Sequence, residues 1–145
     1  MRYVYPVRVE KDEDGRYLAT APDVPEAMTD GEILDEALAG MSDALGAALA
    51  GYSLEGRDLP LPSAVASGLH AVPVAPLVAA KLALRNVMQV GEINNSELAR
   101  RLGVSEGAVR RLVDPDHASR LDRVVAALEV LGHNLIIEDQ ARDAA

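Results

Sequence analysis

The chain has 145 residues, of which 49% are hydrophobic, and this suffices for one ordinary domain or two small ones with packed cores. It contains no cysteine, which excludes disulfide frameworks, thiolate metal sites and cysteine nucleophiles. The net charge of −9 is uneven, because residues 1–68 hold thirteen acidic and five basic side chains, whereas residues 81–123 hold six acidic and eight basic ones. With no apolar run of membrane-spanning length and no signal-peptide core at the N-terminus, we expect a cytoplasmic protein.

The N-terminal segment has the pattern of a small antiparallel sheet. Aromatic and β-branched residues alternate over 3–10, where Pro6 suits an edge strand or a strand start. The pair Asp14-Gly15 predicts a type I′ turn that leads into a returning strand at 17–21. A third short strand is expected at 27–29.

A long helix should cover this sheet. Apolar residues repeat at intervals of three and four from Ile33 to about Tyr52, which is typical of an amphipathic helix. A short fourth strand is expected at 59–61, before a stretch rich in proline and serine. The sequence therefore predicts an α+β protein with three parts: a β-β-β-α-β domain at 1–66, a linker at 67–76 and a helical domain at 77–145.

The helical domain is centred on residues 93–113, INNSELARRLGVSEGAVRRLV. Asn94 followed by Glu97 predicts an N-cap with a capping box, and Gly103 stands where a left-handed C-cap is needed. Ser105 is the next N-cap. Two short helices joined by a tight turn that contains glycine are typical of a helix-turn-helix, whose second helix enters the major groove of DNA.

The same pattern predicts which side chains would face DNA. Val104 is expected to anchor the turn in the core, while the start and the outward face of the second helix would see base edges. The residues expected at or near bases are Ser105, Glu106, Gly107, Arg110 and Arg111, and those expected near phosphates are Lys81, Arg100 and Arg101. A helix pair from an ordinary bundle uses the same caps and remains the alternative.

Further helices are expected on both sides, over 77–90 and 120–131, and LIIE at 135–138 predicts a terminal strand. This strand has no neighbour in its own domain, and a lone strand needs a partner. The simplest partner is its copy across a two-fold axis, which would present two reading helices to a palindromic site. We therefore expect a homodimer or a tetramer.

Two resemblances add to this reading. The residues SELARRLGVSEGAVRRLV followed by SRLDRVVAALEVLG resemble the XRE-type helix-turn-helix family. They depart from it at Glu106, because a carboxylate at the tip of a reading helix repels phosphate and accepts only from a cytosine amino group. The residues EDGRYLATAPDVPEAMTDG followed by EILDEALAGMSDALGAALAGYSLEGRDLPLPS resemble the HicB family of antitoxins, over essentially all of 3–63.

The second resemblance implies a fold and a function. It implies that the N-terminal domain has a partial RNase H-like fold and neutralises a HicA-like toxin, a small ribonuclease, by covering its active site. The C-terminal domain would repress the shared operon as a dimer. An acidic domain suits a basic RNA-binding partner. The residues expected to bind the toxin are Asp12, Asp14, Tyr17, Asp23 and Glu26.

Two other function classes stay open from the residues alone. One is a stand-alone repressor whose N-terminal domain senses a ligand or a protein. The other is a metal-dependent nuclease, which needs several carboxylates around metals about 4 Å apart, normally with one in the middle of the first strand. The only acid of that strand is Glu10, at its end, so we predict no catalytic residues, no metal site and no cofactor.

Overall fold

The computed structural model describes residues 1–142. The chain forms two compact units, Met1–Ala79 (unit 1) and Ala80–Ala145 (unit 2), and the boundary between them falls inside helix α2 (Pro76–Val90). The predicted α+β class is confirmed, because unit 1 holds a four-stranded sheet with a long helix and helices follow it. No helix in the described part of the chain combines the length and apolar character needed to span a bilayer.

Unit 1 is built on an antiparallel sheet with the strand order β3-β2-β1-β4. β1 (Val4–Lys11) pairs with β2 (Tyr17–Thr20), and β2 pairs with β3 (Met28–Gly31). The other edge of β1 pairs with β4 (His70–Pro73). The earliest strand of the sequence therefore lies beside the latest one, and the predicted order β-β-β-α-β is confirmed.

The position predicted for the fourth strand, 59–61, is wrong. No strand forms there, and β4 lies instead within 67–76, the stretch predicted to be a linker. Pro60 and Pro62 explain the difference, because each removes an N–H donor that a strand would need for its ladder.

The turn between β1 and β2 also differs from the prediction. A type I′ turn needs positive φ at both central residues, and Gly15, with φ 79°, is the only residue of this turn that has it. The Gly15 N–H donates to the Asp12 carbonyl (3.1 Å). Asp12 Oδ1 accepts the N–H groups of Asp14 and Arg16, each at 2.9 Å. The hairpin is thus closed by an aspartate side chain and one left-handed glycine.

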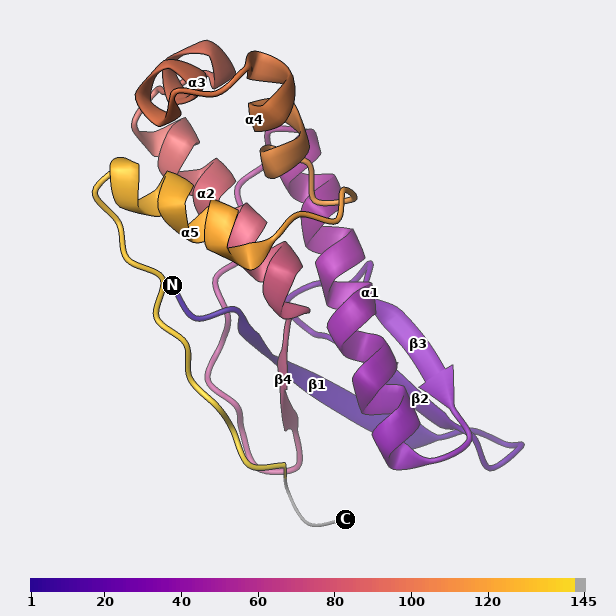
Figure 1. Cartoon of the computed structure of the whole chain (residues 1–145). Coiled ribbons are helices and arrows are strands. Elements are labelled where there is room, and N and C mark those ends of the chain that lie inside the picture. Colours follow the sequence, from indigo (N-terminus) through magenta and orange to yellow (C-terminus); the bar gives the residue numbers. More distant parts are fainter. Residues whose placement is uncertain (143–145) are drawn as a thin grey trace. The chain divides into compact units, whose positions relative to one another are not determined.

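Helix α1 (Leu34–Leu54) lies across one face of the sheet (Figure 1). The two layers approach closely at Gly31, where a Cβ atom would lie 2.7 Å from the backbone nitrogen of Ala37. The side chains buried in unit 1 include Tyr5, Val7, Ala19, Met41, Leu45 and Leu49. Since strand side chains alternate between faces, the neighbours of these core residues in the strands point away from α1.

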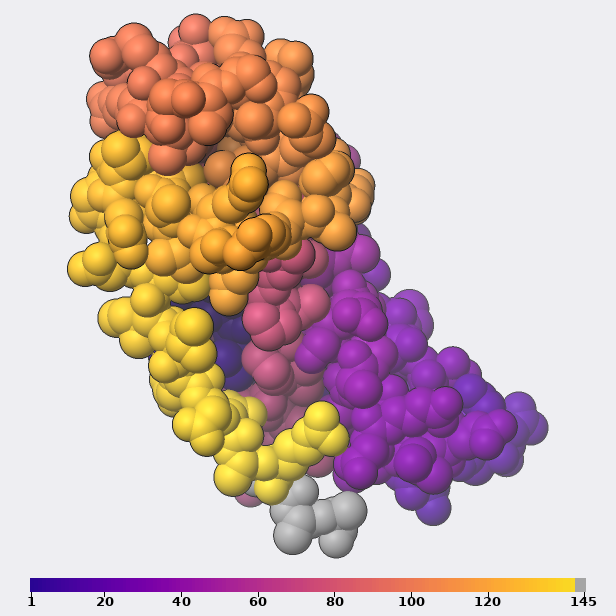
Figure 2. All heavy atoms as spheres, in the orientation of Figure 1, coloured from indigo at the N-terminus to yellow at the C-terminus, as the bar shows by residue number. Residues whose placement is uncertain are grey.

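The helices of unit 2 are α3 (Asn95–Leu102), α4 (Glu106–Val113) and α5 (Leu121–Val130), which follow the end of α2. Figure 2 shows their atoms, in salmon to yellow, packed against one another. The buried side chains of unit 2 include Leu84 of α2 together with Leu98, Val109, Val124, Ala127 and Leu128 of α3 to α5. Gly132 ends the predicted pattern after α5 with φ 83°.

The terminal strand predicted at 135–138 is absent from the single chain, in which residues 133–142 form neither helix nor strand. Ile136 is 87% exposed and Ile137 is 78% exposed. The prediction placed the partner of this strand on a second copy, and a strand without a partner leaves its backbone groups unpaired.

Candidate functional site

Two eight-residue helices, α3 and α4, form the candidate nucleic-acid interface of unit 2. Asn94 Oδ1 accepts the N–H of Glu97 at 2.8 Å, and Ser105 Oγ accepts the N–H of Ala108 at 3.1 Å. Each bond satisfies a backbone donor that the first turn of a helix leaves free. Both predicted N-caps are therefore confirmed, and the starts of both helices are fixed by local sequence.

The turn between these helices is only partly as predicted. Gly103 has φ 69° and ends α3 in the left-handed conformation, as expected. The prediction that Val104 is a buried anchor is wrong, since its side chain is 44% exposed. Leu98 of α3 and Val109 of α4 are fully buried in unit 2 instead.

The predicted capping box is only half formed. The Glu97 carboxylate accepts bonds from Arg100, at 2.5 and 2.9 Å, and from Arg101 at 2.9 Å, instead of returning to the backbone N–H of Asn94. Hydrogen bonds from Arg100 and then Arg101 lower the pKa of Glu97 to about 2. Both arginines, predicted near phosphates, are exposed, with Glu97 partly neutralising their charge.

The outward side of α4 carries two arginines. A Cβ atom on Gly107 would lie 3.6 Å from a guanidinium nitrogen of Arg110 and 3.6 Å from one of Arg111. Both guanidinium groups therefore reach back toward the start of the helix, the direction in which helical side chains point. Glu106 lies 3.8 Å from Arg110. At the start of α4, the guanidinium groups of Arg110 and Arg111 thus lie beside Gly107, and the carboxylate of Glu106 lies next to Arg110.

Lys81 does not lie where the sequence predicts it. It is fully buried, and its Nζ donates to the carbonyls of Arg111 (3.1 Å), Asp114 (2.8 Å) and His117 and to Ser119 Oγ (2.8 Å). Burial lowers the pKa of Lys81, and the charge of Asp114 opposes this. The prediction that Lys81 contacts phosphate is wrong, because its ammonium group is enclosed by backbone and hydroxyl oxygens.

The residues predicted to bind the toxin form two groups at opposite ends of β2. Asp12, Asp14 and Tyr17 lie at the β1–β2 turn, where the Asp12 carboxylate holds the turn and Lys11 Nζ stands 5.2 Å from the Tyr17 ring centroid. Asp14 is exposed at the tip. This end of unit 1 thus combines a fixed backbone with exposed charge.

The second group lies in the loop between β2 and β3. Asp23 accepts the N–H and the hydroxyl of Ser63, both at 2.7 Å. Glu26 Oε2 accepts the hydroxyl of Tyr52 at 2.6 Å, a bond that lowers the pKa of Glu26. Both carboxylates therefore tie the loop to other parts of unit 1.

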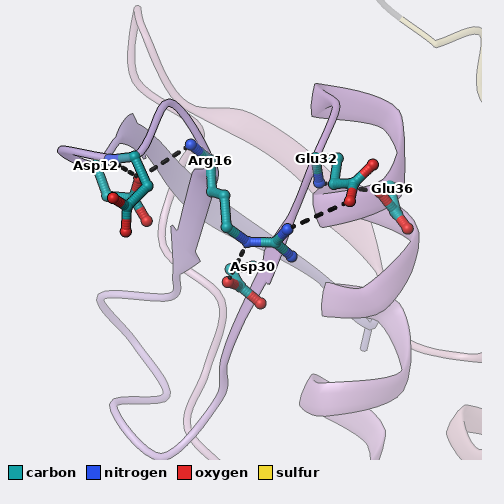
Figure 3. A network of polar contacts seen from close by, with 6 residues as sticks. Asp12, Arg16, Asp30, Glu32 and Glu36 are labelled. Atoms are coloured by element: carbon teal, nitrogen blue, oxygen red, sulfur yellow. Dashed lines mark hydrogen bonds and ion pairs between the residues drawn. The ribbon is translucent and has the colours of Figure 1, made fainter.

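Sequence reasoning missed a third acidic group, which lies where β2 begins and β3 ends, beside the first turn of α1. Arg16 Nε bonds Asp30 Oδ2 at 2.8 Å, and Arg16 Nη1 lies 3.7 Å from Glu32 Oε1 (Figure 3). Glu36 Oε2 in turn accepts the backbone N–H of Glu32 at 2.9 Å. The pairing of Tyr17 with Gly31 places Arg16 and Glu32 side by side. Only the register between β2 and β3 reveals that these charged residues are neighbours, and the sequence alone does not give that register.

No group of three or more histidine or acidic side chains in residues 1–142 is arranged to hold a metal ion. Glu10, the only acid of β1 and the residue nearest to a nuclease carboxylate in position, is exposed.

The sequence matches a family model described as HicB_like antitoxin of bacterial toxin-antitoxin system, over residues 4–83. This match covers more than half of the chain. The chain belongs to the HicB-like antitoxin family. The family match includes nearly all of unit 1 and ends within α2.

The similarity of this HicB-like antitoxin to curated relatives extends through both units. Antitoxin HicB 2 of Photorhabdus laumondii is 39% identical over 131 residues, which cover 90% of this chain and 92% of that protein. Antitoxin HicB of Escherichia coli K12 is 37% identical over 131 residues, covering 90% and 95%. Antitoxin HicB of Pseudomonas fluorescens is 36% identical over 140 residues, covering 96% and 95%.

Proposed function

We propose that this chain neutralises a cognate HicA-like ribonuclease toxin by direct binding through unit 1 and represses its own operon through α3 and α4. It acts as a cytoplasmic regulator and not as an enzyme. The observation that carries the proposal is the similarity to proteins named antitoxin HicB over 90% or more of the chain, because it includes both units.

The charge of unit 1 supports a basic protein partner. Unit 1 carries thirteen acidic side chains against five basic ones. A ribonuclease that binds RNA presents a basic surface, and complementary charge speeds association and selects the partner. The proposed toxin-binding residues are the groups at the two ends of β2, namely Asp12, Asp14, Tyr17, Asp23 and Glu26.

The arrangement of α4 supports DNA reading. Its buried side fixes it in unit 2, while Arg110 and Arg111 flank Gly107 on the outside. Arginine pairs well with guanine in the major groove, and a glycine allows the backbone to approach the base edges. We assign the base contacts to Ser105, Glu106, Gly107, Arg110 and Arg111, and the phosphate contacts to Arg100 and Arg101.

The proposed repressor binds its operator as a homodimer, or as a tetramer of two such dimers. Ile136 and Ile137 are largely exposed in the single chain, and apolar side chains in an extended segment favour pairing with a second copy. Two-fold symmetry would place the two α4 helices at half-sites about 34 Å apart.

The deciding experiment co-expresses the full chain with the small open reading frame beside its gene, followed by size-exclusion chromatography with light scattering. We expect a stoichiometric complex whose partner is toxic when expressed alone. If no complex forms and this chain alone still binds upstream DNA as a dimer, toxin neutralisation is refuted. The chain would then be a repressor whose unit 1 senses a ligand.

A further inference from the structure

The C-terminal end of α4 is held by two cations from α2. The three N–H donors of Lys81 Nζ lie within hydrogen-bond distance of four oxygens, namely the carbonyls of Arg111, Asp114 and His117 and the hydroxyl of Ser119. One helical turn later, Arg85 Nη1 donates to the carbonyl of Val113 at 3.1 Å. Three of these carbonyls, those of residues 111, 113 and 114, belong to the end of α4 or its C-cap.

These contacts fall where a helix most needs cations. The last carbonyls of a helix lack intrahelical partners, and the helix dipole places negative charge at the same end. Asp114, the C-cap of α4, is extended, with φ −78° and ψ 113°, so no left-handed residue satisfies these carbonyls. The donors come from side chains of α2 instead.

The burial of Lys81 makes its hydrogen bonds important to the packing of unit 2. A fully buried ammonium group is tolerated only when hydrogen-bond acceptors replace its water. Removing it would leave several carbonyls at the junction of α4 and the 114–119 loop without that donor, and unsatisfied buried acceptors are costly. Ser119 Oγ also lies 3.4 Å from the Arg111 carbonyl, within reach of the same end of the helix.

Helix α4 has only eight residues, too few to hold its direction without tertiary contacts. Its buried side chains, Val109, Leu112 and Val113, fix which side faces the core. A short helix held only by such apolar contacts can still slide or tilt. The cations of α2 fix its far end, and thereby the direction of its near end, where Arg110 and Arg111 flank Gly107.

We propose that Lys81 and Arg85 are positioning residues for operator reading, which set the direction of α4 from behind and do not touch DNA. This inference rests on the proposed function, since it presumes that α4 reads bases. It assigns a role in DNA recognition to two cations that lie at the opposite end of α4 from Glu106 and Gly107.

A positioning residue and a phosphate-contacting residue differ in how their loss affects the preference for operator DNA over other DNA. Loss of a phosphate contact weakens binding to all DNA sequences alike and lowers the salt dependence by about one unit. Loss of helix positioning removes base contacts, so operator affinity falls while affinity for scrambled DNA, held by Arg100 and Arg101, persists. The ratio of the two affinities is therefore the measurement that decides.

The test uses the full chain and Lys81→Met, which keeps the length and apolar stem of the side chain but removes the cation. Fluorescence anisotropy compares DNA upstream of the operon with a scrambled duplex of equal length, and Arg101→Ala is the matched phosphate control. We expect operator affinity of Lys81→Met to fall about tenfold, the size of one lost base contact. Affinity for scrambled DNA should stay within about twofold, whereas Arg101→Ala should weaken both duplexes alike.

Equal loss on both duplexes, or wild-type affinity of a folded Lys81→Met, would overturn the positioning role. If Lys81→Met does not fold, Ser119→Ala removes one partner of the same ammonium group. It should also lower the ratio of operator affinity to scrambled-DNA affinity, but by a smaller factor. Hydrogen exchange provides a readout independent of DNA, because amides of 109–119 should exchange faster in the variant while those of α3 do not. Failure of the wild type to prefer upstream DNA would instead refute the proposed function.

Discussion

The hydroxyl of Tyr52 donates a 2.6 Å hydrogen bond to Oε2 of Glu26, and this bond joins the last turns of α1 to the loop between β2 and β3. The guanidinium carbon of Arg57 stands 3.8 Å from the centroid of the same ring. Together these contacts fix a loop that we propose to be part of the toxin-binding surface. They also lower the pKa of Glu26, chiefly through the bond from Tyr52.

Tyr52→Phe should therefore lower stability in a pH-dependent way. Because the pKa of Glu26 is lowered in the folded state, its contribution is fully present above the ordinary value of 4.5 and is lost as pH falls through the lowered value. Urea unfolding at pH 7 should show a lower midpoint for Tyr52→Phe than for the wild type, and the two midpoints should converge as the pH falls through the lowered pKa of Glu26. Equal midpoints at pH 7 would show that the bond contributes nothing.

Glu97 should titrate far below an ordinary glutamate. Its bonds from Arg100 and Arg101 lower its pKa to about 2, from 4.5. The stability that these bonds provide is present above pH 4.5 and is lost as pH falls toward 2. An NMR titration of the side-chain carboxyl carbon should give this value, and Glu97→Gln should flatten the stability profile between these two pH values. A midpoint near 4.5 would mean that the arginine contacts do not persist in solution.

Two glycines of unit 1 should respond oppositely to alanine. At Gly31 a Cβ atom would lie 2.7 Å from the backbone of Ala37, so Gly31→Ala should cost about 1–3 kcal/mol through overpacking. At Gly51, inside α1, nothing lies within 4 Å of that position, so Gly51→Ala should gain about 0.5–1 kcal/mol from helix propensity. Urea denaturation of the full chain measures both changes. A neutral Gly31→Ala would mean that α1 can shift away from β3 at little cost.

The double change Arg110→Ala and Arg111→Ala should abolish operator binding. Each good base contact contributes about 1–3 kcal/mol, so the loss of two lowers affinity by roughly 30-fold or more. The toxin complex should be unaffected, because these side chains belong to unit 2. Gel-shift titration tests this against Arg8→Ala, a variant that removes an exposed arginine of unit 1. Operator affinity retained by the double variant would remove α4 from the interface.

Asp14→Lys should weaken the toxin complex and leave DNA binding intact. No hydrogen bond to the Asp14 carboxylate is found within residues 1–142, so the change reverses charge at the hairpin tip without breaking a bond that holds the turn. Reversal of one rim charge acts mainly on the association rate. Calorimetry and stopped-flow association measure the effect, with Asp43→Lys on the exposed side of α1 as the control. Equal behaviour of the two variants would place the toxin elsewhere on unit 1.

The features of the fold that the sequence predicted well depend on neighbours along the chain. The N-caps at Asn94 and Ser105 each bond a residue three positions later, so the residue types alone reveal them. The place of β4 depends on pairing between Val4 and Pro73, and nothing local distinguishes that strand from a linker. The stretch at 59–61 is a different case, because Pro60 within it and Pro62 beside it are local signals against a strand.

In the candidate site too, features set by nearby residues were predictable and features set by distant contacts were not. Arg110 and Arg111 follow from helical spacing and are exposed, as the sequence predicts. Lys81 looks like a surface lysine on an amphipathic helix, and its burial depends on carbonyls of residues 111, 114 and 117 that only the folded chain brings to it. The pairing of Arg16 with Asp30 likewise required the register between β2 and β3.

The pairing of β1 with β4 sets an order of events during synthesis. The sheet of unit 1 can close only after His70–Pro73 has been made, and α3 and α4 are translated after that segment. At roughly 5–20 residues per second, about 2–8 seconds separate the synthesis of Pro73 from that of Val113, the last residue of α4. Under the function proposed above, unit 1 would thus be able to engage a toxin before α4 can read the operator.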